Sequence, residues 1–187
     1  MKKKAIWQIA FEFLSIVFAV LLALGLNSYK QNKDLESEGK LLRERIITEC
    51  RRNTSELDSV ILLNQEVFSF IDSLSQLDDL NIGGFDVNIA NRLLTKSAWI
   101  FTQASRSFSF MDENFLNDAA LLYEQQDYYM TISNQMFEKL GDMLLSDPDA
   151  EKMVTLIHYY LSNLNNTSAE LRRTYADFLK EYDTSGS

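Results

Sequence analysis

Residues 11–29 read FEFLSIVFAVLLALGLNSY, an apolar run that carries a carboxylate at Glu12 and an amide at Asn27. Together with the residues before it, the apolar stretch from Ala5 to Leu26 would be about 33 Å long as a helix, at about 1.5 Å per residue. The hydrocarbon core of a bilayer is roughly 30 Å thick. The sequence therefore predicts a single transmembrane helix over residues 5–27.

The flanks of this segment predict its orientation. Residues 1–4 read MKKK, and such a compact basic end tends to stay in the cytoplasm. The chain from residue 28 onward is then expected in the periplasm. A cleaved signal peptide is the alternative, because the small residues Ala23 and Gly25 could form a processing site. The length of the apolar run and the polar residues inside it favour a retained membrane helix.

The polar and small residues of the segment share one face of the predicted helix, because each lies three or four positions from the last. They are Gln8, Glu12, Ser15, Ala19, Ala23 and Asn27. Small residues spaced in this way let membrane helices approach closely. We therefore expect this stripe, called the membrane stripe below, to be a helix–helix interface within the bilayer.

Glu12 has two competing interpretations. As a hydrogen-bonding residue it would fix the register between helices, as polar residues on small-residue faces commonly do. As an isolated carboxylate in lipid it could instead couple to protons or ions. Because an unpaired charge is costly there, it should be protonated, bonded to Gln8 or matched by a partner chain. Replacement of Glu12 by Gln would separate the two interpretations.

These residues resemble a family of uncharacterised bacterial single-pass inner-membrane proteins built around a domain of unknown function. The matching pattern is Glu12, then Ser15-Ile16-Val17, Ala19 to Leu24, Leu26-Asn27 and an aromatic residue at Tyr29. The family's Glu-x-x-x-Asn motif after the membrane helix is matched by Glu49 and Asn53, and a weaker similarity covers Trp99 to Tyr129. Tyr29 stands where the family more often has Trp. The resemblance implies a topology and a Gram-negative inner membrane but no activity, and it marks Glu12, Asn27, Glu49 and Asn53.

Composition favours an all-α fold and excludes some partners. The chain has only six glycines and one proline, which leaves few of the turns that strands and hairpins need. Its net charge is -9, so nucleic acid would be repelled and is not an expected partner. Cys50 and His158 are the only cysteine and the only histidine, so the chain cannot form an internal disulfide or a Cys/His metal cluster. A disulfide between two chains through Cys50 stays open.

The membrane helix is predicted to continue into a long amphipathic helix over residues 28–80. Apolar residues and asparagines recur there in steps of mostly three and four. The row is Leu42, Ile46, Cys50 or Glu49, Asn53, Leu57, Val60, Asn64, Val67, Ile71 and Leu74. It could form a homomeric coiled coil or the face on which later helices pack. In either case, buried polar residues at Glu49, Asn53 and Asn64 would fix the register.

Three further helices are expected to pack with this one as an extracytoplasmic bundle within residues 28–182. The first is a short helix over residues 86–96, capped by Asp86 and with Ile89, Leu93 and Leu94 inward. The others cover residues 118–145 and 147–182, the last opened by Asp147 and Pro148. Residues 99–110 are expected to form a loop or a short helix, and residues 183–187 a disordered tail.

No enzyme motif is found in the sequence. It has no glycine-rich phosphate loop, GxSxG, HExxH or CxxC, so we expect neither catalysis nor a cofactor or metal. The sequence favours an accessory or scaffold protein that is embedded in the lipid bilayer. It would assemble through the membrane helix, as a homo-oligomer or with another membrane protein, and bind a partner protein with its outer domain. A helical sensory module acting through a membrane partner is the alternative, and a proton- or ion-coupling subunit using Glu12 is a further one.

Overall fold

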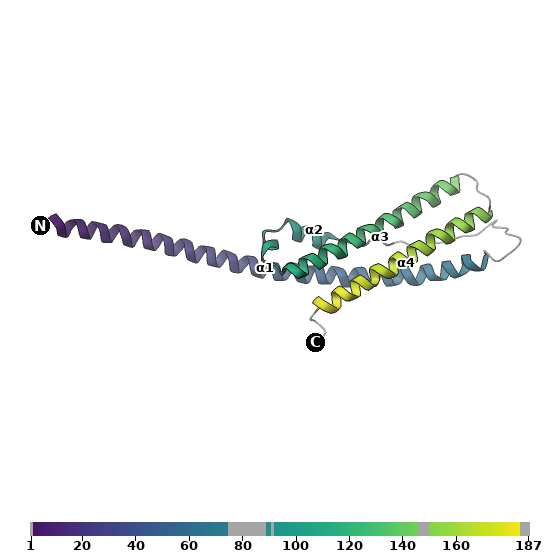
Figure 1. Ribbon diagram of the computed structural model, residues 1–187, viewed down its shortest axis with the longest axis horizontal. Coiled ribbons are helices and arrows are strands. Elements are labelled where there is room, and N and C mark those ends of the chain that lie inside the picture. The colour runs from purple at the N-terminus through teal and green to yellow at the C-terminus, as the bar shows by residue number, and fades with distance from the viewer. Residues whose placement is uncertain (1, 75–88, 91, 146–149, 184–187) are drawn as a thin grey trace.

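The computed structural model describes residues 2–74, 89, 90, 92–145 and 150–183. Within these ranges the regular structure is entirely helical, which confirms the predicted all-α class. The elements are α1 (Lys2–Leu74), α2 (Ser97–Ala104), the 3-10 helix η1 (Arg106–Phe110), α3 (Glu113–Leu145) and α4 (Ala150–Tyr182) (Figure 1).

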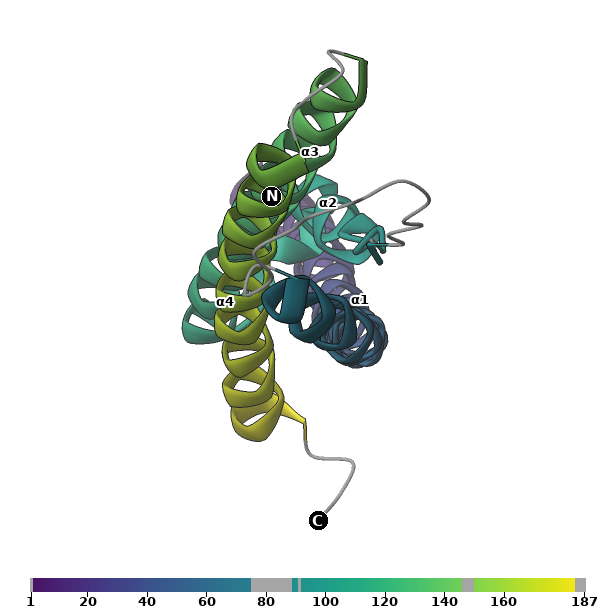
Figure 2. The same cartoon turned by 90° about the vertical axis from the view of Figure 1, so that its right-hand side faces the viewer.

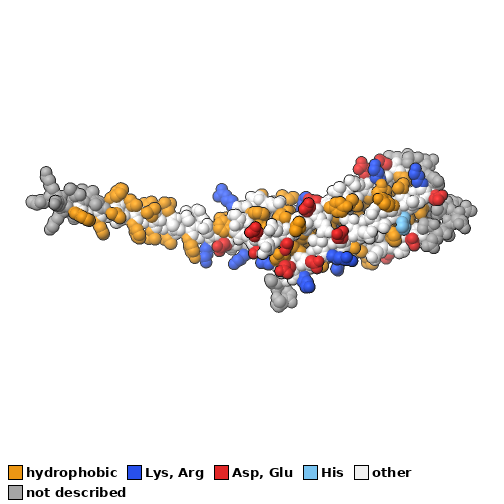
Figure 3. Space-filling model, in the orientation of Figure 1, with side chains coloured by type: hydrophobic (Ala, Val, Ile, Leu, Met, Phe, Trp, Pro, Cys, Tyr) orange, Lys and Arg blue, Asp and Glu red, His pale blue; other side chains and the backbone are white. Residues whose placement is uncertain are grey.

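Helix α1 runs without interruption through both the apolar segment and the polar row. Its 73 residues correspond to a length of about 110 Å, and no proline breaks them. The amino-terminal part projects away from the other helices in Figure 1, and hydrophobic side chains cover it in Figure 3. This stretch is long and apolar enough to cross a membrane, and none of it is buried within the chain. The long apolar amino-terminal helix is thus present as predicted.

From Leu35 onward α1 becomes part of what we call the packed region, the described residues Leu35–Asp183. Here α4 contacts both α1 and α3, and α2 and η1 lie against α1. The end-on view in Figure 2 shows α1 and α4 next to each other. Two apolar clusters fill the interior. One includes Trp99, Phe115, Tyr123 and Tyr175, and the other includes Ile71, Met143, Val154 and Leu161.

The polar and apolar row predicted on α1 faces this interior. Leu42, Ile46, Cys50, Leu57, Val60 and Ile71 are each at most 1% exposed. Because the later helices of the same chain cover the row, it is not free to form a coiled coil with a second chain. The spacing left open a homomeric coiled coil or a face on which later helices pack, and the structure has the second arrangement.

The short helix expected over residues 86–96 is absent from the part of that range that the structure describes. Residues 89, 90 and 92–96 are not helical, and α2 begins only at Ser97. Leu93, expected to point inward, is 78% exposed, whereas Leu94 is buried. Asp86 lies outside the described residues. The reason for the missing helix lies in the contacts of this segment with α1, described below.

Other boundaries shift by a few residues. Helix α3 begins at Glu113 rather than 118, because the Asp112 carboxylate accepts a hydrogen bond from the Phe115 N–H at 2.8 Å and caps the helix start. At the other end of the packed region, the Asp183 carboxylate accepts a hydrogen bond from Arg51 Nε at 2.6 Å. Asp183 is therefore not part of a free tail. The predicted positions 75–80, Asp147 and Pro148 lie outside the described residues.

Candidate functional site

Three polar residues of α1 predicted to fix the register are almost completely enclosed. Glu49, Asn53 and Asn64 are 5%, 1% and 0% exposed. Burial of such groups is costly unless each polar atom finds a hydrogen-bond partner. Their partners therefore show what these residues do.

The two asparagines hold the non-helical segment that precedes α2. Asn64 Nδ2 donates to the Ala90 carbonyl at 3.1 Å, and Asn64 Oδ1 accepts from the Ala90 N–H at 2.9 Å. In the same way, Asn53 Nδ2 donates to the Thr95 carbonyl at 2.7 Å, and Asn53 Oδ1 accepts from the Thr95 N–H at 3.1 Å. Each side-chain amide thus pairs with both backbone groups of one residue, as a neighbouring strand would. We call these two pairings the asparagine clamps.

The spacing of the clamps explains the missing helix. Asn53 and Asn64 lie eleven positions apart, which is three turns and about 16 Å along α1. Ala90 and Thr95 lie five positions apart, and five residues cover about 16 Å only when nearly fully extended. In a helix they would cover roughly 7.5 Å and could not reach both asparagines. The clamps therefore require an extended chain where local apolar spacing predicted a helix.

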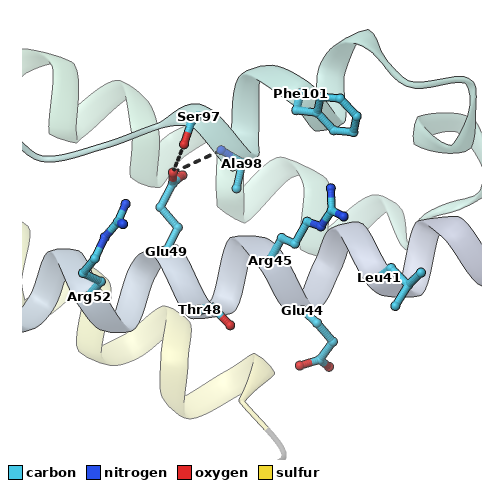
Figure 4. Close-up of a pocket in the computed structure, with 9 residues that line it drawn as sticks. All are labelled: Leu41, Glu44, Arg45, Thr48, Glu49, Arg52, Ser97, Ala98 and Phe101. Carbon is cyan, nitrogen blue, oxygen red and sulfur yellow. Dashed lines mark hydrogen bonds between the residues drawn. The ribbon is translucent and has the colours of Figure 1, made fainter.

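Glu49 caps the start of α2 from a neighbouring helix. Its carboxylate accepts hydrogen bonds from the Ser97 hydroxyl at 2.8 Å and the Ala98 N–H at 3.1 Å (Figure 4). It also accepts one from the Tyr123 hydroxyl at 2.7 Å. Burial alone would raise the pKa of Glu49, but these donors outweigh it and hold the pKa below its ordinary value. An anion at a helix amino terminus is also favoured by the helix dipole. Since the Lys96 side chain makes no capping bond, Glu49 supplies the cap that α2 lacks.

A second polar layer lies behind the clamps. Asn53 Nδ2 also donates to the Tyr175 hydroxyl at 3.0 Å and to Gln126 Oε1 at 3.2 Å, and Tyr175 donates to Gln126. Through these contacts α1 is joined to both α3 and α4. Burial, together with nearby acidic groups, raises the pKa of the Tyr175 hydroxyl, which therefore stays a donor at neutral pH.

Cys50 lies between these groups and is 0% exposed, with its Sγ 3.9 Å from the Tyr123 hydroxyl. Burial raises the pKa of the Cys50 thiol to about 12, so the reactive thiolate is scarce at neutral pH. A disulfide between two chains, left open by the sequence, would first require the packed region to open.

The membrane stripe has no such partners. Glu12, Ser15, Ala19, Ala23 and Asn27 are all exposed, and the side chain of Gln8 is not among those that the structure describes. The Ser15 hydroxyl donates to the carbonyl of Glu12 at 2.8 Å, a bond within the same helix turn. No described part of the chain covers the stripe.

A shallow groove of about 530 Å³ lies between α1 and α2, directly outside Glu49. Leu41, Arg45 and Arg52 line its α1 side, and Ala98 and Phe101 line its α2 side (Figure 4). The Arg45 guanidinium lies 5.8 Å from the centre of the Phe101 ring. The groove, referred to below as the α1–α2 groove, was not foreseen from the sequence, because the sequence left residues 99–110 open as a loop or a short helix and did not place them against α1.

Other chemistry is sparse in the described residues. They include no group of three His, Cys, Asp or Glu that could hold a metal ion. His158 Nε2 lies 3.5 Å from the Asp72 carboxylate, and its ring lies 4.8 Å from that of Phe68. These contacts join α4 to α1 and offer no nucleophile. The three buried polar residues Glu49, Asn53 and Asn64 thus each bind backbone groups of the chain itself.

No family model, curated protein or solved structure matches this chain. The family resemblance of Glu12 to Asn53 therefore stays a prediction, and the function has to be inferred from the residues themselves.

Proposed function

We propose that the protein is a non-enzymatic, single-pass accessory or scaffold subunit of a bacterial inner membrane. Its membrane helix would assemble with another helix through the membrane stripe, and a periplasmic helical bundle would bind a partner protein. The observation that carries this proposal is the division of one uninterrupted helix, α1, into an uncovered apolar part and a part enclosed by the chain.

Membrane insertion is supported by the apolar surface that α1 leaves open. Trp7, Phe11 and Phe13 are 78%, 76% and 68% exposed, and apolar residues continue through Leu26. Soluble proteins rarely expose contiguous apolar surface on this scale, so lipid is its natural solvent. At the far end Lys33 lies 5.8 Å from the Tyr29 ring, an arrangement of aromatic and basic residues common at the membrane interface.

Assembly within the membrane is supported by the polar residues that share the stripe. A carboxyl or an amide in lipid is costly unless it is paired, and Glu12 and Asn27 project from the same face as Ser15 and Ala19. A neighbouring helix that packs on this face would both fill the space above the small residues and supply hydrogen-bond partners.

Photocrosslinking in intact cells tests the assembly. A benzophenone amino acid at Ala19, on the stripe, should yield a protein adduct, whereas one at Leu24, on the opposite side, should yield lipid adducts only. In mild detergent, after the mass of the bound detergent is subtracted, the full chain should also have a mass above that of its 21.6 kDa monomer. A monomer with no protein adduct at Ala19 would contradict the proposal.

A sensory module is the second candidate, favoured by the same continuity of α1. A helix that enters the packed region without a break could transmit motion between that region and the membrane. A ligand that raises the melting temperature of residues 28–187 would support this candidate. Proton or ion coupling through Glu12 is a third, less favoured candidate, and the Glu12→Gln substitution described below separates it from the others.

A further inference from the structure

Every described side chain of α1 over residues 11–34 is exposed, and within the packed region the uncovered face of α1 lies on the same side of the helix as the membrane stripe. At about 100° per residue, the average direction of the membrane stripe lies within about 40° of that of Leu41, Arg45, Thr48 and Arg52. These four are exposed, and the buried row of α1 lies roughly 150° away from the stripe. A helix packed on the stripe could therefore follow α1 outward to the α1–α2 groove without meeting α3 or α4.

The chemistry of the groove indicates what such a helix would carry. Leu41 and Phe101 are 61% and 55% exposed and offer apolar surface. Arg45 and Arg52, two turns apart on α1, are exposed, and neither forms an ion pair with a carboxylate among the described residues, while Arg52 donates a hydrogen bond to the Thr95 hydroxyl. Of the two carboxylates that also line the groove, Glu49 is bonded to Ser97 and Ala98, and Glu44 points away from α2 in Figure 4. This combination of apolar and basic side chains suits an amphipathic helix with an apolar residue flanked by carboxylates.

A second copy of this chain does not fit these charges. Copies inserted in the same orientation pack in parallel, and a two-fold contact places the same patch on both subunits. In register, Arg45 would face Arg45 and Arg52 would face Arg52, which is repulsive. The groove therefore favours a different protein.

We infer that one partner protein occupies both the membrane stripe and the α1–α2 groove. Its transmembrane helix packs on the stripe and continues outward as an acidic amphipathic helix that docks on Leu41, Arg45, Arg52 and Phe101. Leu41 lies about 21 Å beyond Asn27 along the helix axis and Arg52 about 38 Å, which sets the length of the continuation. The inference rests on the proposed function. It adds that the partner is a different protein and that the partner makes a second contact, at the α1–α2 groove.

The test uses the full chain in its source cells, with the benzophenone amino acid at Ala19, at Leu41, or at Leu121, an exposed residue of α3. Adducts are excised and identified by mass spectrometry. We expect the same protein at Ala19 and Leu41, and the peptide joined to Leu41 should follow that protein's transmembrane helix and contain Asp or Glu. Leu121 should not capture it.

Charge reversal supplies the second arm. Arg45→Glu with Arg52→Glu should weaken the Leu41 adduct about tenfold and leave the Ala19 adduct in place. The matched control is Arg173→Glu with Lys180→Glu, two exposed basic residues at the same spacing on α4. It should change neither adduct. Unaltered melting temperatures of both double variants exclude unfolding as the cause.

The outcomes separate the two proposals. An Ala19 adduct with none at Leu41, or an unchanged Leu41 adduct after charge reversal, overturns the groove inference and leaves the assembly proposal standing. A Leu41 adduct made of this chain alone shows a second copy and also overturns the inference. Absence of any protein adduct at Ala19 contradicts the assembly proposal itself.

Discussion

The two halves of α1 treat their polar residues in opposite ways. In the membrane half, Glu12 and Asn27 are exposed and face outward from the chain. In the packed half, Glu49, Asn53 and Asn64 are enclosed and bonded to a segment from the same chain. Polar residues at the same helical spacing therefore stabilise the fold of the chain in the packed half. In the membrane half, we propose, they bind a second helix.

The difference teaches that a polar residue on a helix face does not by itself indicate which partner it meets. In the packed half the backbone partners follow 26 to 49 positions later, in the non-helical segment before α2 and at the start of α2 itself. In the membrane half the rest of the chain is not close enough to supply one. Four sets of substitutions, in order of decreasing expected effect, test this contrast.

The largest effect is expected for Asn53→Ala, which removes a clamp. The variant leaves both backbone groups of Thr95 without their partner, and each buried unpaired group costs about 1–3 kcal/mol. We expect a loss of roughly 3 kcal/mol in the free energy of unfolding, measured by denaturant titration of the full chain in detergent micelles. Asn64→Ala should cost less, because Asn64 pairs with Ala90 alone whereas Asn53 also contacts Gln126 and Tyr175.

Amide hydrogen exchange provides the control for this prediction. In Asn53→Ala the Thr95 N–H should exchange faster while that of Ala90 stays protected, and in Asn64→Ala the pattern should reverse. Losses below about 0.5 kcal/mol in both variants would contradict a stabilising role of the clamps.

A smaller loss, roughly 1–2 kcal/mol at neutral pH, is expected for Glu49→Gln, which weakens the cap of α2. Because the pKa of Glu49 is lowered on folding, its stabilisation is fully present above the ordinary value of 4.5 and is lost as the pH falls through the folded pKa. The difference between the native protein and Glu49→Gln should therefore shrink below about pH 4.5. Glu44→Gln, at an exposed carboxylate of the same groove, is the control. If the free energy of unfolding varied with pH in the same way in Glu49→Gln and in the native protein, the charge of Glu49 would not contribute to stability.

In the membrane half, Glu12→Leu should weaken assembly by roughly 1 kcal/mol, about fivefold, without changing the unfolding of the packed region. Glu12→Gln should retain assembly, since an amide can still bond across helices. The measurement is the yield of the Ala19 photoadduct in membranes. If Gln were as damaging as Leu, the carboxyl group itself would be required, as in proton coupling.

The smallest effect is expected for the two glycines of α1, Gly25 in the membrane half and Gly39 in the packed half. A Cβ at Gly25 would meet nothing within 4 Å, and one at Gly39 would lie 3.2 Å from Cγ of Met111, a flexible side chain. Alanine gains about 1 kcal/mol of helix propensity over glycine. Gly39→Ala should therefore change the unfolding free energy by no more than about 0.5 kcal/mol, because the shift of Met111 offsets part of the gain. A loss above about 2 kcal/mol would mean that the Met111 contact is rigid.

Secondary structure and buried positions are predicted well from the sequence where they depend on the spacing of residues within a single helix. Helical periodicity was enough to identify the apolar segment, the continuous helix beyond it and the buried positions of Asn53 and Asn64. Periodicity misled at residues 86–96, where the spacing of Ile89, Leu93 and Leu94 is typical of a helix, because the contacts of this backbone with Asn53 and Asn64 decide its conformation instead. The groove, with Phe101 on its α2 side, could not be predicted, because residues 99–110 were compatible with a loop as well as with a short helix.

The sequence by itself determined the helical class, the long apolar helix and the faces of α1, since these depend on residues three or four positions apart. Only the tertiary structure decided which groups the buried polar residues bind, where α2 begins and that Asp183 is held by Arg51. Those contacts join residues 26 to 132 positions apart. For the asparagine clamps, the match depends on how far a helix and an extended segment each advance per residue. A pattern of residues three or four positions apart carries no information about such a match.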